Sequence, residues 1–290
     1  MNHMALSTSP RPALLHPSFG LAYAQAHRAM VTAGKRGLTP RASFIDGGRG
    51  RSKPYAFVEG IAIIGVQGCL EPNYPWIGDP WATGYDALRF QLQAAFADDD
   101  VSGIVLNIDS YGGMVAGCFD LCDYILEAKA AAKKPLVAIL AEMAYSAAYA
   151  IAATADSISV PRTGGLGSIG VICVHWNIAG ALEKWGEQPT LVFAGSHKAD
   201  GNPFGPLSDD VRAEMQADVE ATRQLFAETV ARGRASAGVK LSQQTIIATE
   251  ARCYDGPVNT AEAVRLGFAD AVAAPDRAFA ALVNQLSERT

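Results

Sequence analysis

Short apolar runs alternate with longer amphipathic stretches along most of this 290-residue chain. Three aliphatic runs bounded by glycine or polar residues predict buried strands, namely GIAIIGVQG (60–68), GIVLNID (103–109) and PLVAIL (135–140). Helical periodicity follows the first two, over GYDALRFQLQAAFADD (84–99) and CFDLCDYILEAKAAAK (118–133). Strands that alternate with helices usually pair in parallel, so the pattern predicts an α/β layered domain.

The same alternation continues in the second half of the chain. DSISV (156–160), GSIGVICVHW (167–176) and PTLVFAG (189–195) each predict a strand, and NIAGALEKWG (177–186) predicts a helix. A long helix is predicted over 207–238, with Ser208 as its N-cap and acidic residues in its first turn.

Charge divides the chain into two parts. The chain carries a net charge of −5, but residues 1–54 contain eight Lys or Arg and one acid, which leaves about −12 on the remainder. After Pro17 the first part shows helical periodicity, and residues 36–54 have the composition of a linker. We therefore predict a basic N-terminal arm and linker over 1–54, either a disordered leader or a segment with its own partner, and a compact domain over 55–290.

Composition excludes several classes of protein. No run approaches the roughly 18 apolar residues of a membrane span, and the N-terminus lacks the layout of a signal peptide. The five cysteines are scattered, and Cys118 and Cys122 fit small core residues better than disulfides or metal ligands. We expect a reduced, cytoplasmic protein that needs no metal or other cofactor and has no membrane anchor.

Ser146 stands out because it lies between the apolar run PLVAIL and the alanine-rich stretch AAYAIAAT. A hydroxyl at a strand-to-helix turn can cap the helix, and the local stretch alone favours that interpretation. It can also be a nucleophile exposed at the mouth of a site. If it is a nucleophile, the amide of Ala147 could donate to an oxyanion.

Two further segments could complete such a site. Gly112 and Gly113 follow a predicted strand and precede a helix, where their amides could form an oxyanion hole or simply a tight turn. A serine nucleophile needs a base. His175 lies in an apolar run, whereas Lys198 lies in the glycine-containing segment AGSHKADG and would become a base if it were buried.

The segments SYGG, EMAYSAAY, GSIGV and GSHK occur in the order and spacing of the S49 family of serine peptidases, which the chain resembles over about residues 55–275. That family, which includes signal peptide peptidase A, has a fold similar to those of Clp protease and crotonase, so the resemblance implies a layered fold of this kind. The segments GGMVAG, ALEKWG and GSHKADGNPFGPLSDDV resemble most closely the lambda-type phage head maturation proteases.

The resemblance assigns roles to individual residues. It implies that Ser146 is the nucleophile, that Lys198 is the general base and that Ser168 orients the lysine amine. Gly112, Gly113 and Ala147 would hold the oxyanion. We expect the pocket walls near Ser146 to come from apolar and aromatic residues that favour small or apolar substrate side chains, namely Tyr111, Met114, Met143 and Tyr145. Two departures affect substrate preference, since Tyr111 replaces a proline and YSAA replaces the usual sequence around the nucleophile.

The resemblance also implies a biological setting. The resemblance implies a serine endopeptidase that cleaves scaffold, portal and coat proteins, and also itself, during phage or prophage head maturation. Such an enzyme would act as a homo-oligomer inside the assembling prohead in the host cytoplasm and would not require nucleic acid.

Three alternatives remain open from the sequence. One is a Clp-like protease in which His175 is the base for Ser146, and another is a housekeeping enzyme like signal peptide peptidase. The third is an inactive, protease-like assembly scaffold.

Overall fold

A computed structural model describes residues 13–15, 53–74 and 76–288 of the chain. A single sheet organises these residues, and its main path runs in the order β10-β7-β6-β5-β3-β2. The strands of this path are β2 (Ala56–Val58), β3 (Ile61–Glu71), β5 (Gly103–Met114), β6 (Leu136–Tyr145), β7 (Ser157–Val160) and β10 (Ala271–Val272). Neighbours from β3 to β10 are parallel, and only β2 at the edge is antiparallel to its neighbour.

Three shorter strands pair at the carboxyl ends of the central strands, and a fourth pairs with one of these three. They are β1 (Ala13–Leu15), β4 (Ala82–Gly84), β8 (Gly165–Gly167) and β9 (Cys253–Asp255). The strand β4 extends the sheet beside β3, β8 runs parallel to the end of β6, and β9 is antiparallel to β8. The strand β1 is antiparallel to the end of β5. In parallel α/β sheets this edge is where functional sites form.

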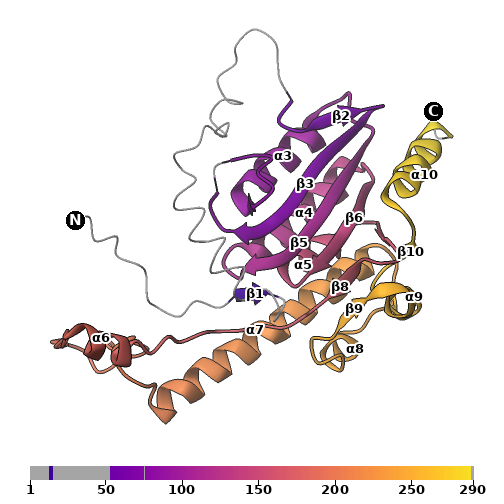
Figure 1. Ribbon diagram of the computed structural model, residues 1–290. Helices are drawn as coiled ribbons and strands as arrows, with labels where there is room; N and C mark the ends of the chain where they lie inside the picture. The colour runs from indigo at the N-terminus through magenta and orange to yellow at the C-terminus, as the bar shows by residue number, and fades with distance from the viewer. Residues whose placement is uncertain (1–12, 16–52, 75, 289–290) are drawn as a thin grey trace, which may run out of the picture.

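Helices connect the strands and cover both faces of the sheet (Figure 1). They are α3 (Tyr85–Ala97), α4 (Cys118–Ala132), α5 (Ala147–Ala152), α6 (Ala179–Trp185), α7 (Asp209–Ser236), α8 (Gln243–Ile247), α9 (Gly256–Leu266) and α10 (Pro275–Ser287). The main core lies between one face of the sheet and α3, α4, α5 and α7, and contains the buried residues Cys118 and Cys122 as the sequence predicted. A smaller core joins the other face to α10 through Leu282.

The structure confirms the α/β layered architecture and most of the elements that the sequence predicted. The expected strands at 60–68, 103–109, 135–140 and 156–160 correspond to β3, β5, β6 and β7. The long helix is α7, and the hydroxyl of its N-cap Ser208 accepts a hydrogen bond from the amide of Val211 at 3.3 Å. The helical segment expected after Pro17 lies outside the described residues.

Two predicted strands are absent from the described residues. Neither 167–176 nor 189–195 forms a strand beyond the last residue of β8, although both are apolar. An apolar run becomes a strand only when another strand pairs with it. Among the described residues beyond β8, pairing in these two segments is limited to an isolated bridge at Ile172.

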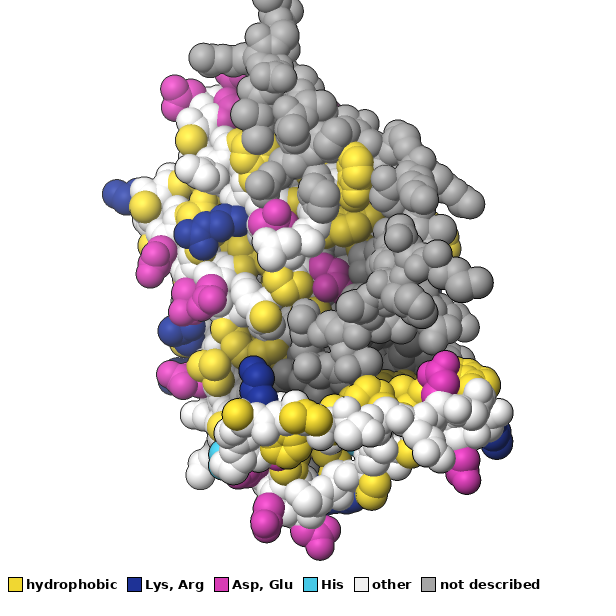
Figure 2. Space-filling model, turned by 90° about the vertical axis from the view of Figure 1, so that its left-hand side faces the viewer, with side chains coloured by type: hydrophobic (Ala, Val, Ile, Leu, Met, Phe, Trp, Pro, Cys, Tyr) yellow, Lys and Arg dark blue, Asp and Glu magenta, His cyan; other side chains and the backbone are white. Residues whose placement is uncertain are grey.

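All of the second segment and the first from residue 171 onward belong to a projecting arm, which we define as residues 171–208. Together with the start of α7 this arm extends away from the sheet (Figure 1). Figure 2, viewed from the side of α6, shows hydrophobic side chains on this lower, projecting part. Seven large apolar side chains of the arm are exposed, namely Val174, Trp176, Trp185, Leu191, Val192, Phe193 and Phe204.

A buried arginine joins α7 to the loop after α9. The side chain of Arg234 is fully buried, donates to the carbonyl of Gly267 at 3.0 Å and forms an ion pair with Asp270 at 2.8 Å. The other carboxylate oxygen of Asp270 accepts from the amide of Ile158 in β7. This network fastens the long helix to the edge of the sheet.

We predict that Arg234→Ala lowers the free energy of unfolding by about 3–5 kcal/mol, because it leaves the Asp270 carboxylate without its buried partner. Arg232 is the matched control, since it lies on the same helix but pairs with Asp123 at the surface. Arg232→Ala should cost no more than about 1 kcal/mol. Urea unfolding of both variants measures the difference, and equal losses would contradict the structural role given to Arg234.

Candidate active site

Ser146 forms a strained turn between β6 and α5. The strand ends at Tyr145, the helix begins at Ala147, and Ser146 between them has φ 54° and ψ −122°. A positive φ is unfavourable for a residue with a side chain and costs about 1–3 kcal/mol. The backbone amide of Ser146 donates to the carbonyl of Gly167 in β8 at 2.8 Å, which holds the turn against the neighbouring strand.

The side chain of Ser146 does not cap the helix. Its backbone carbonyl accepts hydrogen bonds from the amides of Tyr149 and Ala150, but its hydroxyl makes no capping bond. The Oγ atom is buried and has no hydrogen-bond partner among the described residues. The N-cap interpretation that the local sequence favoured is therefore wrong. An unpaired buried hydroxyl costs free energy, so both the backbone and the side chain are held in an unfavourable state that suits a nucleophile.

Ser168 lies beside this turn. It directly follows Gly167, whose carbonyl accepts the hydrogen bond from Ser146, and its own amide donates to the carbonyl of Arg252 at 3.1 Å. Ser168 is buried and also has a positive φ, of 55°. Its hydroxyl is hydrogen-bonded to the thiol of Cys253, whose pKa rises to about 11 mainly because of burial. Cys253 therefore stays a neutral thiol at neutral pH.

The oxyanion candidates lie at the carboxyl end of β5 and the start of α5. Gly112 has φ 102°, a conformation that favours glycine, and its amide donates to the hydroxyl of Ser110 at 3.1 Å. This bond uses the Gly112 amide within the chain. Gly113 pairs with Leu70 in β3 so closely that a Cβ atom at Gly113 would lie 1.9 Å from the carbonyl oxygen of Leu70. Ala147 is the first residue of α5, so its amide lacks a partner within the helix.

A side-chain bridge crosses β8 behind the nucleophile. The hydroxyl of Tyr145 donates to the carboxylate of Asp255 in β9. Burial and this carboxylate raise the pKa of Tyr145, which keeps the hydroxyl protonated as the donor. The bridge passes over Gly165, where a Cβ atom would lie 1.9 Å from the Tyr145 hydroxyl. The residue before the nucleophile is thus tied to two further strands.

The four predicted wall residues have different environments. Tyr145 is only 7% exposed and belongs to the bridge, so a positioning role fits its contacts better than a pocket wall. Met114 is buried with Tyr111 and Ile172 packed around it, and Met143 is half-buried. Burial raises the pKa of Tyr111 to about 12, so this phenol is neutral at neutral pH.

The candidate bases do not lie at Ser146 within one chain. Lys198 is exposed, in the part of the projecting arm between α6 and α7. The burial that would make this lysine a base is therefore not met in the single chain. In the same arm, His175 contacts the carbonyl of Asn202 through Nε2 at 2.8 Å, and His197 is bonded to Asp200, which raises the pKa of its imidazole.

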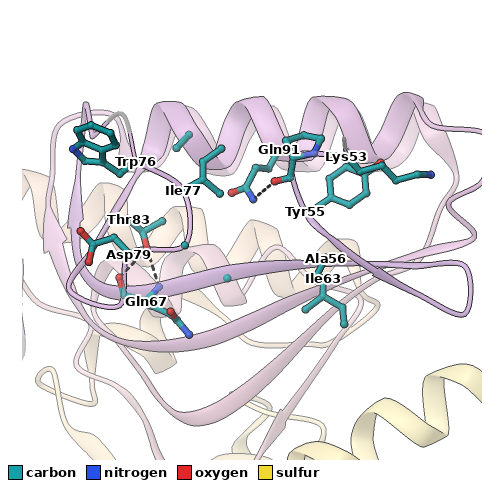
Figure 3. Close-up of a pocket in the computed structure, with 14 residues that line it drawn as sticks. Lys53, Tyr55, Ala56, Ile63, Gln67, Trp76, Ile77, Asp79, Thr83 and Gln91 are labelled. Atoms are coloured by element: carbon teal, nitrogen blue, oxygen red, sulfur yellow. Dashed lines mark hydrogen bonds between the residues drawn. The ribbon is translucent and has the colours of Figure 1, made fainter. Parts of the chain in front are cut away.

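One well-formed cavity lies away from the Ser146 turn. A cavity of about 410 Å³ opens between α3 and the strands β2 and β3, and Lys53, Gln67 and Trp76 lie on its wall (Figure 3). It contains none of the predicted catalytic residues. The metal-ligand grouping found among the described residues, formed by His197, Asp200 and Glu214, is fully exposed, and nothing else there points to a bound ion.

Sequence reasoning did not single out several residues that shape the site. Gly165, Gly167 and Asp255 hold the Ser146 turn. The hydroxyl of Ser110 accepts a hydrogen bond from the Gly112 amide, and the thiol of Cys253 is hydrogen-bonded to the Ser168 hydroxyl. Apart from the local bond between Ser110 and Gly112, these contacts join segments that are separate in sequence. A short glycine segment or an aspartate before a helix gives no local signal for such a role.

A nucleophile-type serine at a strained strand-to-helix turn, on the carboxyl edge of a parallel sheet, defines a candidate hydrolase. The model of peptidase family S49 matches residues 128–288, which is more than half of the chain. This chain therefore belongs to peptidase family S49.

Two phage proteins are similar over most of the chain. Capsid assembly protease C of Escherichia phage lambda is 41% identical over 229 residues, which cover 78% of this chain and 49% of the phage protein. Head-tail preconnector protein GP5 of Enterobacteria phage P21 is 38% identical over 217 residues, covering 73% and 41%. Protease 4 of Haemophilus influenzae is 27% identical over 184 residues, covering 63% and 29%. The chain thus spans about half the length, or less, of the curated relatives it matches.

Among solved structures, an enoyl-CoA hydratase/isomerase family member aligns with 80% of this chain and 74% of its own, at 17% identity and a TM-score of 0.43. Within the described residues, every helix is too short or too polar to cross a lipid bilayer.

We predict that Gly165→Ala destabilises the domain by about 1–3 kcal/mol, because the added methyl group overlaps the Tyr145–Asp255 bridge. Gly180→Ala in α6 is the control, since nothing lies within 4 Å of the added methyl group there. Thermal unfolding compares the two variants. A Gly165→Ala protein as stable as Gly180→Ala would show that the bridge does not hold the turn.

Proposed function

We propose that this chain is a serine endopeptidase that uses a Ser-Lys dyad to cleave capsid-assembly proteins during phage or prophage head maturation. The observation that carries the proposal is the state of Ser146, a buried hydroxyl without a partner among the described residues, on a turn with positive φ. Neither feature helps the fold, and both prepare a serine to attack a carbonyl carbon.

The base in this proposal is Lys198 of a neighbouring copy. Within one chain Lys198 is exposed and the arm that carries it lies away from the sheet. The arm also exposes large apolar side chains, including Trp176, Val192 and Phe193, which a monomer rarely leaves uncovered. A second copy that covers this arm would bury these side chains and bring Lys198 into an apolar environment. Burial of this kind lowers the pKa of a lysine and makes its amine a usable base.

The chemistry follows from these groups. The neutral amine of Lys198 accepts the proton of the Ser146 hydroxyl as Oγ attacks the peptide carbonyl. The amides of Gly113 and Ala147 donate to the oxyanion, since the Gly112 amide is already bonded to Ser110. Ser168 orients the lysine amine. The protonated lysine then gives its proton to the leaving amine. In the second half of the reaction the neutral lysine accepts a proton from water, which attacks the acyl-enzyme, and the proton then passes to the Ser146 oxygen as the product leaves.

The substrate assignment rests on the relatives. The lambda protein is named a capsid assembly protease and the P21 protein a head-tail preconnector, and both are similar over nearly three quarters of this chain or more. We therefore propose that scaffold, portal and coat proteins are the substrates, and that cleavage takes place within the assembling prohead in the host cytoplasm. Cleavage in the basic arm remains a further proposal.

The contacts of the histidines favour lysine as the base. The Nε2 atom of His175 is engaged with the carbonyl of Asn202, and His197 is bonded to Asp200. Both pairings lie within the arm and neither involves the nucleophile turn.

We predict that Lys198→Ala abolishes peptide cleavage while leaving the fold intact, and that His175→Ala and His197→Ala each retain substantial activity. Only the neutral amine can accept a proton, so kcat/KM of the wild type should rise with pH through an apparent pKa below the free-lysine value of about 10.4. A histidine base would level off near pH 7–8. Rate profiles on one peptide test this, and an active Lys198→Ala enzyme beside a dead His175→Ala enzyme would reverse the assignment.

Mixing two inactive variants tests whether the dyad forms between copies. Ser146→Ala and Lys198→Ala should each be inactive alone, because each copy lacks one member of every dyad. After partial unfolding and joint refolding, mixed oligomers should regain up to about a quarter of wild-type activity, since random assortment pairs an intact Ser146 with an intact Lys198 at about one site in four. Variants that stay inactive when mixed, although they form mixed oligomers, would place both residues of the dyad in one chain.

A further inference from the structure

A short segment of the N-terminal arm pairs with the strand that carries the oxyanion glycines. The strand β1 is antiparallel to β5, with Ala13 opposite Met114, Leu14 opposite Gly113 and Leu15 opposite Gly112. Figure 1 shows β1 beside the carboxyl end of β5, while the rest of the described domain begins at residue 53.

The other pairings of the sheet fix the side of β5 on which β1 lies. At Gly112 and Gly113, one edge of β5 is occupied by Cys69 and Leu70 of β3. A strand has only two hydrogen-bonding edges, so β1 must use the edge that faces β6. Pairing between β5 and β6 ends at Ser110. Beyond that point the two strands separate, and β1 enters the fork between them.

The nucleophile lies on the opposite side of this fork. The strand β6 continues from Ala144, the partner of Ser110, to Tyr145 and then to the Ser146 turn. The strand β1 therefore lies between the glycine strand and the nucleophile turn. Ser146 has no exposed surface, so a peptide substrate can reach it only if part of the present structure moves.

We propose that residues 13–15 act as a tethered peptide that occupies the substrate site of their own chain and blocks it until the arm is displaced or cut. This inference rests on the proposed function, because it identifies the fork as the place where a substrate peptide binds. An extended peptide that adds to a free strand edge gains affinity from main-chain hydrogen bonds, which do not depend on its sequence. The N-terminal arm and a foreign peptide would therefore compete for the same edge of β5.

The sequence of the segment suits a short, extended occupant. Pro12 and Pro17 flank it, and a proline cannot donate to a strand ladder. These restrictions limit pairing to a few residues, so the arm can bind the edge and still be released. If the arm fills the site nine-tenths of the time, the apparent affinity for another peptide falls about tenfold.

The test uses the full chain with Ser146→Ala, which prevents cleavage. Successive amides of a strand point to opposite edges, so only one of the Leu14 and Leu15 amides faces β5. Leu14→Pro combined with Leu15→Pro removes that amide in either case. Hydrogen exchange of the peptide that contains Gly112–Met114 should become faster in this variant. A fluorescent peptide with the sequence of residues 10–19 should bind the variant about tenfold more tightly than the Ser146→Ala parent.

The matched control is Leu38→Pro combined with Thr39→Pro, which changes the same arm outside β1 and should leave both measurements at the parent values. Unchanged exchange and affinity in the Leu14→Pro, Leu15→Pro variant would overturn the inference. With Ser146 restored, the same pair of prolines should raise kcat/KM on a peptide substrate several-fold.

Exchange and binding do not require catalysis, which separates this inference from the proposed function. If the prolines speed exchange and tighten binding but the wild type cleaves no peptide, the proposed function is contradicted and the strand competition is supported. Cleavage by the wild type, with exchange and affinity unaffected by the prolines, would overturn the competition alone.

Discussion

The hydrogen bond from the amide of Ser146 to the carbonyl of Gly167 is the constraint on which the site depends. A turn with positive φ at a serine would relax to an ordinary backbone conformation unless neighbouring structure held it. This bond ties the turn to β8, and the Tyr145–Asp255 bridge ties the preceding residue to β9. Because Ser168 follows Gly167 directly, the same contact fixes the distance between the two serines. The nucleophile is therefore positioned by strands that come from three distant parts of the chain.

Half of the proposed catalytic machinery lies outside this rigid region. The sheet, the Ser146 turn and Ser168 form one packed body, whereas Lys198 is exposed on an arm that makes few contacts with that body. An arm with exposed tryptophan and valine side chains gains stability when another surface covers it. The same coverage would desolvate the lysine, so assembly and activation become one physical event. Activity restricted to an assembled state would protect other proteins from premature cleavage.

The parts of the fold that follow from local pattern were predictable from the sequence. Aliphatic runs and helical periodicity located β3, β5, β6 and α7, because burial on a sheet or helix face leaves a periodic trace. The runs at 167–176 and 189–195 gave a wrong prediction, since within the described part of the chain they form no strand beyond β8 and only an isolated bridge at Ile172. Ser146 was identified, but its local sequence favoured a cap. The roles of Gly165 and Asp255 depend on contacts across β8, which leave no trace in a short window of sequence.

Covalent trapping of the nucleophile tests the central claim that the Ser146 turn is a reactive site. The native protein is treated with a fluorophosphonate, digested and analysed by mass spectrometry. We expect a single phosphonylated serine at position 146, and no adduct after the protein is unfolded, because the reactivity comes from the held turn and its base. An adduct on Ser168 or on surface serines instead, or equal labelling of Ser146 in the native and unfolded protein, would contradict it.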